Sequence, residues 1–157
     1  MGMIEELIQQ KNFSTDHEKA SIGLLYASNM LCDFHQNFLK KFDITPQQYN
    51  VLRILRGQQS KPITIGLLKD RMIDRNSDIS RMVERLRKAE LIQRLVSEND
   101  KRAVDVIISE KGLSLLTQID NYKEELSEPL KALNINELEV FNALMDKLLK
   151  DLSNRLS

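Results

Sequence analysis

The chain has 157 residues, of which 41% are hydrophobic and only 5% aromatic, which is enough for a packed and mainly helical core. Its single cysteine excludes an intrachain disulfide and a multi-cysteine zinc site. No stretch has the length and apolar character of a membrane span or a signal peptide, so we expect a cytoplasmic protein with no membrane partner.

The charges sum to zero, but they are distributed unevenly along the chain. Residues 61–102 contain eleven lysines and arginines against seven acidic residues, a balance of +4. Residues 103–157 contain six against ten, a balance of −4. Nucleic-acid-binding proteins need a local basic face and not a basic average, so the middle segment favours an anionic partner. A bias of this size also arises by chance.

A long helix is predicted from about residue 18 to residue 41. Its apolar side chains recur at steps of three and four residues, at Leu24, Ala27, Leu31, Phe34 and Phe38. A helix of this length usually packs against more than its own small domain.

The next helix is predicted to begin at Thr45. Thr45 suits the N-cap, Pro46 the first helical position and Gln48 the third, and together they form a capping box. The helix is expected to end near Gly57. Its inward side chains are Val51, Leu52, Ile54 and Leu55.

Two shorter helices follow at a spacing typical of a helix-turn-helix. The first is expected over residues 64–72, capped by Thr64, with Leu67, Leu68 and Met72 buried. The second is expected over about residues 76–89, with Ile79, Val83 and Leu86 buried. Two generic packed helices would give the same pattern, so this pattern alone does not establish DNA binding.

A β-hairpin is predicted directly after these helices. Residues 91–96 and 103–108 are rich in β-branched and apolar side chains, and Val104, Val106 and Ile108 share one face at a period of two. The charged tip between the strands spans about residues 97–102. A helix-turn-helix followed by a hairpin is the order of a winged helix, and this order is more specific than either part.

The C-terminal third is predicted to be helical. One stripe, bent at Pro129, consists of Leu115, Ile119, Tyr122, Leu126 and Leu130. A capping box from Asn136 to Glu139 then opens a last helix, whose stripe consists of Phe141, Leu144, Leu148 and Leu152. We expect these helices to pack with the N-terminal helix and with their copies in a second subunit.

The predicted fold is therefore mainly α with a small β-hairpin. We expect an N-terminal helical dimerisation segment at residues 1–44, a winged helix-turn-helix at residues 45–110 and C-terminal dimerisation helices at residues 111–157.

Four segments in this order resemble the MarR (multiple-antibiotic-resistance regulator) family, and the second of them is Leu91-Ile92-x-Arg94. Residues 76–86 resemble the S-x-V-S-R-x-V-x-x-L recognition helix of that family, Asp100-Lys101-Arg102 its D-[RK]-R wing, and Ser109-Glu110-Lys111-Gly112 its T/S-E-x-G element. The resemblance implies a homodimeric transcriptional regulator, read here as a repressor modulated by a small-molecule effector. Its symmetry implies a pseudo-palindromic operator in double-stranded DNA.

The resemblance also assigns the DNA-binding residues. In and before the recognition helix, the candidates for the major groove and its phosphates are Asn76, Ser77, Ser80, Arg81 and Arg85. In the wing, Arg102 is the candidate for the minor groove, Asp100 for orienting Arg102, and Lys101 for a phosphate. Arginine suits both bidentate guanine contacts and narrow, electronegative minor grooves.

Two alternatives remain open from the sequence. The arginines of the recognition helix could form a solvated face in which Glu84 and Glu90 pair with some of them. The whole protein could be a winged-helix protein-interaction adaptor that binds no DNA, which its zero net charge and acidic C-terminal third favour.

Two positions depart from the family. Glu90 stands where the family usually has glycine, which leaves the end of the recognition helix open. Ile22 stands where the organic-hydroperoxide sensors of the family carry a reactive cysteine, and we expect Cys32 to be a small packed side chain in a dimer helix. No catalytic or metal-ligating motif is present, so we expect no enzyme and no cofactor.

Overall fold

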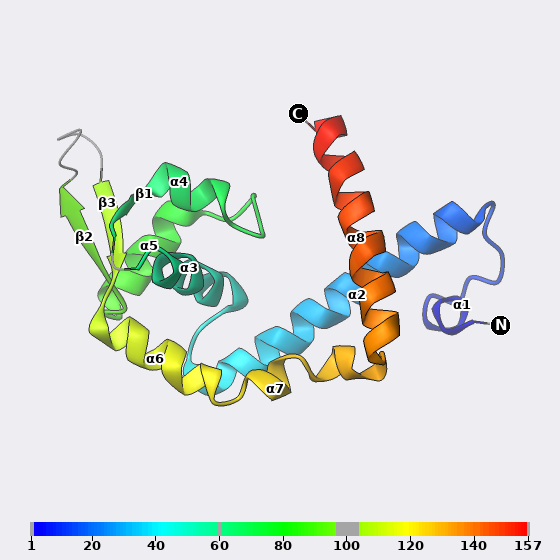
Figure 1. Cartoon of the computed structure of the whole chain (residues 1–157), viewed down its shortest axis with the longest axis horizontal. Helices are drawn as coiled ribbons and strands as arrows, with labels where there is room; N and C mark the ends of the chain where they lie inside the picture. The colour runs from blue at the N-terminus through cyan, green and yellow to red at the C-terminus, as the bar shows by residue number, and fades with distance from the viewer. Residues whose placement is uncertain (1, 60, 97–103, 157) are drawn as a thin grey trace. The chain divides into compact units, whose positions relative to one another are not determined.

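The computed structural model of the chain describes residues 2–59, 61–96 and 104–156. It divides into two compact units, Met1–Asn121 and Tyr122–Ser157, and the prediction of a mainly helical chain with a small β-sheet is confirmed (Figure 1). The first unit contains α1 (Met3–Leu7), α2 (Asp16–Leu39), η1 (Lys40–Phe42), α3 (Pro46–Gly57), β1 (Ile63–Thr64), α4 (Ile65–Asp70), α5 (Ile79–Lys88), β2 (Ile92–Val96), β3 (Val104–Ile108) and α6 (Glu110–Asp120). The second contains α7 (Lys123–Leu126), η2 (Glu128–Ala132) and α8 (Ile135–Leu156).

Side-chain caps start the two longest helices of the first unit. Thr15 caps α2, because its hydroxyl accepts a hydrogen bond from the amide of Glu18 at 3.1 Å. At α3 the Thr45 hydroxyl accepts from the amide of Gln48 at 3.2 Å, and the Thr45 amide donates to Gln48 Oε1 at 2.9 Å. The predicted capping box is thus confirmed. Of the four predicted inward side chains of α3, Val51, Leu52 and Leu55 are buried and Ile54 is half-buried.

The winged part is a three-stranded antiparallel sheet in the order β1-β3-β2. The predicted hairpin is confirmed, with Ile92 opposite Ile108 and Val96 opposite Val104. The structure adds β1, a two-residue strand in which Ile63 lies opposite Val106. The inward side chains of the sheet complete one core with α3, α4, α5 and α6. The fully buried members of this core include Leu52, Leu68, Val83, Leu86, Ile92, Val106 and Leu116.

The short helix α4 corrects one predicted core residue. Thr64 caps it as expected, with its hydroxyl accepting from the amide of Leu67 at 3.2 Å. Leu68 and Met72, four residues apart, face the core, whereas the side chain of Leu67 is 50% exposed. The predicted burial of Leu67 is wrong, because a helix of six residues has one inward stripe and Leu67 lies one position away from it.

Two C-terminal boundaries also differ from those predicted. The helix after the hairpin ends at Asp120, before the predicted bend at Pro129, and it fully buries Leu116 where Leu115 was predicted. The capping box of α8 lies at Asn134 and not at Asn136. Asn134 Oδ1 accepts from the amide of Glu137 at 3.1 Å, and the Asn134 amide donates to Glu137 Oε2 at 2.8 Å, which starts the helix two residues earlier.

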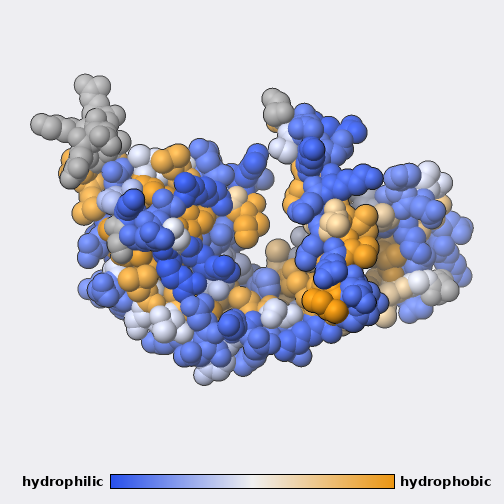
Figure 2. Space-filling view, viewed as in Figure 1, coloured by the Kyte–Doolittle hydropathy of each residue, from blue (hydrophilic) through white to orange (hydrophobic). Residues whose placement is uncertain are grey.

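Each unit exposes apolar side chains on a long helix, and Figure 2 shows hydrophobic surface along α8. No residue of α8 is buried. The large exposed side chains of this helix include Val140, Phe141, Leu144, Leu148 and Leu152. Those of α2 are Leu24, Leu25, Met30 and Phe34.

Candidate nucleic-acid interface

A carboxylate cap starts α5 at Ile79, three residues later than expected. Asp78 Oδ1 accepts from the amide of Arg81 at 3.0 Å and forms the N-cap. Asp74 closes the turn that precedes α5, because its carboxylate accepts from the amide of Asn76 and from the hydroxyl of Ser77, each at 3.0 Å. Asn76 and Ser77 therefore lie in this turn and not on the helix.

The two sides of α5 have opposite character. Ile79, Val83 and Leu86 are buried, as predicted. Successive side chains of a helix turn by about 100°, so the side opposite these residues presents Arg81, Arg85 and Lys88. All three are exposed, and Ser80 is exposed on the flank of the helix.

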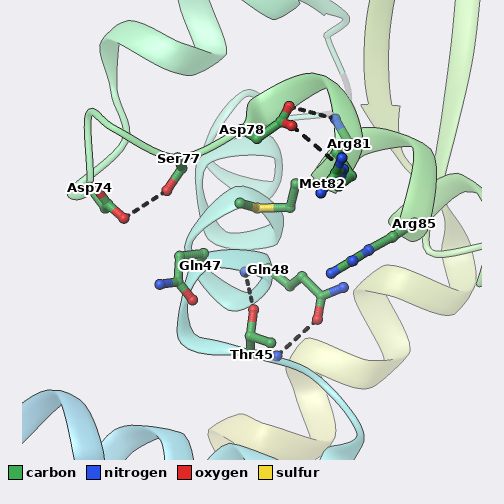
Figure 3. Close-up of a pocket in the computed structure, with 9 residues that line it drawn as sticks. All are labelled: Thr45, Gln47, Gln48, Asp74, Ser77, Asp78, Arg81, Met82 and Arg85. Carbon is green, nitrogen blue, oxygen red and sulfur yellow. Dashed lines mark hydrogen bonds and ion pairs between the residues drawn. The ribbon is translucent and has the colours of Figure 1, made fainter.

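A shallow groove of about 290 Å³ lies between the start of α3, the turn before α5 and α5 itself (Figure 3). In this view Arg85 and Gln48 extend toward each other, while Arg81 lies beside Asp78, with 3.6 Å between Arg81 Nε and Asp78 Oδ2. The groove thus combines two guanidinium groups with two carboxylates. Its lining residues are Thr45, Gln47, Gln48, Asp74, Ser77, Asp78, Arg81, Met82 and Arg85.

The other flank of α5 carries a bound carboxylate. Glu84 accepts from Arg87 Nε at 3.0 Å and from Arg87 Nη2 at 2.8 Å, and its Oε2 lies 3.5 Å from Arg94 Nη1 on β2. The hydrogen bonds from Arg87 lower the pKa of the Glu84 carboxyl below its ordinary value, and Glu84 raises the pKa of Arg87. Glu90 pairs with Lys111 at 3.2 Å.

These ion pairs show which arginines of α5 already bind a carboxylate of the same chain. Arg87 is bound by Glu84. For Arg87, the alternative in which a glutamate pairs with an arginine of a solvated helix face therefore holds. Within the described part of the chain, the ion pair of Arg81 is the longer contact with Asp78. Arg85 has no ion pair among the residues that the structure describes.

Glu90 ends α5 in a left-handed conformation, with φ of 63°. The amide of Glu90 donates to the carbonyl of Arg87 at 2.9 Å, and the amide of Leu91 donates to the carbonyl of Leu86 at 3.0 Å. These two hydrogen bonds form a Schellman motif, whose left-handed residue is usually glycine. The motif explains why this position favours glycine, and it fixes the helix end that the sequence left open.

Gly112 joins the start of α6 to the start of β2. Its amide donates to the hydroxyl of Ser109 at 3.0 Å, and that hydroxyl donates to the carbonyl of Glu90 at 2.7 Å. A Cβ on Gly112 would collide with the carbonyl oxygen of Leu91 and lie 2.8 Å from Ile108 Cγ1. The Ser109–Gly112 element therefore connects the end of α5, the start of β2 and the start of α6.

The three wing candidates, Asp100, Lys101 and Arg102, lie outside the described residues, so their roles stay predictions. The sequence reasoning left out Gln47, Met82 and Lys88. Lys88 had a signal, since it follows Arg81 by seven residues on the same side of the helix. Gln47 and Met82 had none, because only the folded chain places the start of α3 beside α5 (Figure 3).

A helix-turn-helix whose second helix is basic on its outer side, followed by an antiparallel hairpin, defines the winged-helix class of DNA-binding proteins. The model of the MarR family matches residues 44–104, which span the winged helix from α3 to the start of β3. The predicted resemblance to the MarR family is thus confirmed over the winged helix.

Known proteins agree with this assignment. The transcriptional regulator MhqR of Bacillus subtilis is 27% identical over 131 residues, which cover 82% of this chain and 88% of MhqR. A mutant of MarR from Escherichia coli, in complex with operator DNA, has a TM-score of 0.75 at 24% identity and covers 95% of this chain and 99% of its own. The complex of Staphylococcus aureus MepR with DNA has a TM-score of 0.74 at 21% identity and covers 89% and 99%. The structures share the fold, and the curated relatives are transcriptional regulators, so this chain is a transcriptional regulator and not an enzyme.

Other kinds of site find no support in the described part of the chain. No helix there is long and apolar enough to cross a membrane. Within the same residues, no three histidine, cysteine or acidic side chains gather where they could hold a metal ion. Cys32 is exposed on α2 of the single chain.

Proposed function

We propose that the chain is a homodimeric repressor that acts in the cytoplasm and binds a pseudo-palindromic operator, with α5 in the major groove and the wing in the adjacent minor groove. The observation that carries the proposal is the outer side of α5. Arg81, Arg85 and Lys88 are exposed there, opposite the buried side of the helix, and none of them is bound as firmly as Arg87.

The charges around α5 suggest which candidate residue makes which contact with DNA. Asp78 already binds the amide of Arg81, and its negative charge opposes a phosphate at the start of the helix. We therefore assign phosphate and guanine contacts to the guanidinium groups of Arg81 and Arg85, and base-edge contacts to Ser80. Asn76 and Ser77 lie in the turn before α5, from which they are proposed to contact the DNA backbone.

Wing contacts complete the proposal. Arg102 enters the minor groove, Asp100 orients it, and Lys101 contacts a phosphate. The strands on either side, β2 and β3, are paired along their whole described length. Short arginine-bearing loops suit the narrow minor groove, whose negative potential attracts a guanidinium.

The exposed apolar helices support a dimer. Residues 1–44 and 111–157 are proposed to supply its interface, because α8 buries none of its residues and α2 exposes four large apolar side chains. Exposed apolar surface of this extent marks an interaction site. Leu144→Glu should shift the protein to monomers in sedimentation experiments, whereas Lys150→Glu, on the side of α8 away from Phe141, Leu148 and Leu152, should not. An unchanged dimer in Leu144→Glu would contradict this interface.

A small-molecule effector is proposed to act on the same winged helix. The groove beside α5 presents Arg81 and Arg85, so an anion bound there would compete with DNA for both side chains. Lower operator affinity in the presence of such an anion, with unchanged dimerisation, would support this mode.

The DNA contact of α5 is tested by fluorescence anisotropy with an operator selected from random duplex DNA. If Arg85 contacts a phosphate, Arg85→Gln should lower the salt dependence of DNA affinity by about one phosphate contact. If Arg85 contacts a base, the variant should lose about 1–3 kcal/mol of operator binding and some sequence specificity. Lys147→Gln, which removes one charge from α8, is the matched control and should have no effect. No binding to any duplex at low salt would favour a protein-interaction adaptor instead.

A further inference from the structure

One carboxylate on the recognition helix holds two arginines from different elements. Glu84 Oε2 lies 3.0 Å from Arg87 Nε, in the same helix, and 3.5 Å from Arg94 Nη1, on β2. Glu84 Oε1 takes the second hydrogen bond from Arg87, at 2.8 Å. Arg87 therefore fixes the orientation of Glu84. Glu84 Oε2 can still accept a hydrogen bond from Arg94 on β2.

The position of Arg94 makes this contact a link between α5 and the wing. Arg94 lies opposite Val106 on the inward side of the sheet, two residues beyond the buried Ile92. Further along β2, Leu95 is 39% exposed and Val96 is 72% exposed. Among the described residues, the Glu84–Arg94 pair is the ion pair that joins α5 to β2.

The charges of Arg87 and Arg94 explain how Glu84 acts on β2. Arg87 Nε and Arg94 Nη1 both contact Glu84 Oε2, so without the carboxylate these two guanidinium groups would be neighbouring like charges and would repel. With it, each arginine is attracted to the same oxygen atom. The carboxylate thus links β2 to α5, and its removal would loosen this link.

We infer that Glu84 is a positioning residue that sets the angle between the recognition helix and the wing. The inference rests on the proposed function, because this angle matters when α5 and the wing contact one DNA duplex together. Glu84 then raises the preference for operator over random DNA, although its charge has the same sign as that of DNA. A residue that acted only through its charge would weaken operator and random DNA equally.

The link itself is tested without DNA by hydrogen–deuterium exchange. Glu84→Gln keeps the shape of the side chain and removes its charge, and it should speed amide exchange in β2 and β3 by roughly 1.5- to 5-fold, the range that an exposed ion pair supports. Glu90→Gln is the matched control. It also removes a carboxylate, just after the end of α5, but this carboxylate pairs with Lys111 and not with β2. Equal exchange in Glu84→Gln and wild type would overturn the inference.

The consequence for DNA is tested by the ratio of operator affinity to random-duplex affinity at fixed salt. Glu84→Gln should lower this ratio by a similar factor, and the exchanged pair Glu84→Arg with Arg94→Glu, which restores one carboxylate between two arginines, should recover it. A ratio equal to that of wild type, with both affinities raised, would overturn the inference and leave the proposed function intact. Wild-type protein that binds no duplex would overturn the proposed function, and with it the inference about DNA.

Discussion

Replacement of Glu90 by glycine should stabilise this protein, although it removes an ion pair. Glu90 holds φ of 63° at the end of α5. The left-handed conformation costs a residue with a Cβ roughly 1–2 kcal/mol, and glycine avoids this cost. Glycine also adds backbone freedom to the unfolded chain, which offsets about 0.5–1 kcal/mol.

The lost ion pair reduces this gain. The side chains of Glu90 and Lys111 are 80% and 60% exposed, and pairs so exposed contribute between about 0 and 1 kcal/mol. The midpoints of the three ranges leave Glu90→Gly with a free energy of unfolding about 0.3 kcal/mol above that of wild type. Glu90→Ala is the control, since it loses the same ion pair and keeps the unfavourable φ.

Urea denaturation at one fixed protein concentration measures the difference, because the stability of the proposed dimer would depend on concentration. The expected order of stability is Gly, then wild type, then Ala, with the two variants about 1 kcal/mol apart. An alanine variant as stable as the glycine variant would refute the assignment of Glu90 to the left-handed position of a Schellman motif.

Three further predictions concern other parts of the winged helix. Gly112→Ala should cost about 1–3 kcal/mol of stability by overpacking, whereas Gly57→Ala, where a Cβ meets nothing within 4 Å, should cost none; equal effects by thermal unfolding would contradict the packing of α6 on β2. The stability advantage of wild type over Glu84→Gln should be present above the ordinary glutamate pKa of 4.5 and should disappear as pH falls through the lowered pKa of the folded state; a constant difference down to pH 2 would contradict the ion pair. Arg102→Ala should cost about 1–3 kcal/mol of operator binding at fixed salt, and unchanged anisotropy titrations would remove the wing arginine from the DNA interface.

The parts of the fold that the sequence predicted correctly depend on local chemistry or on a clear period. The Thr45 capping box involves four consecutive residues, so it could be recognised without the rest of the chain. The inward stripe of α5 and the alternation of β3 are equally local, and both are confirmed.

The missed boundaries depend on competition between neighbouring polar residues. Asp74 and Asp78 are both able to cap a helix, and the structure uses Asp74 for a turn and Asp78 for the start of α5. The same competition moved the start of α8 from Asn136 to Asn134. Periodicity carries no information on which of two capping residues closes the turn.

The candidate site was predictable in its residues and not in their pairing. Spacing placed Arg81, Arg85 and Arg87 on one recognition helix, but only the folded chain shows that Glu84 binds Arg87 and leaves Arg85 without an ion pair among the described residues. Arg94 comes from a different element, and its contact with Glu84 depends on how β2 packs beside α5.

Selection of bound fragments from a pool of random duplex DNA tests the central claim most directly. A homodimer that reads DNA with α5 and the wing should enrich a pseudo-palindrome whose half-sites lie about one helical turn, 10–10.5 base pairs, apart. The Arg85→Gln variant should enrich it less strongly than wild type. Recovery of random sequences by wild-type protein, at a salt concentration that permits binding, would contradict the claim that this chain is a sequence-specific dimeric regulator.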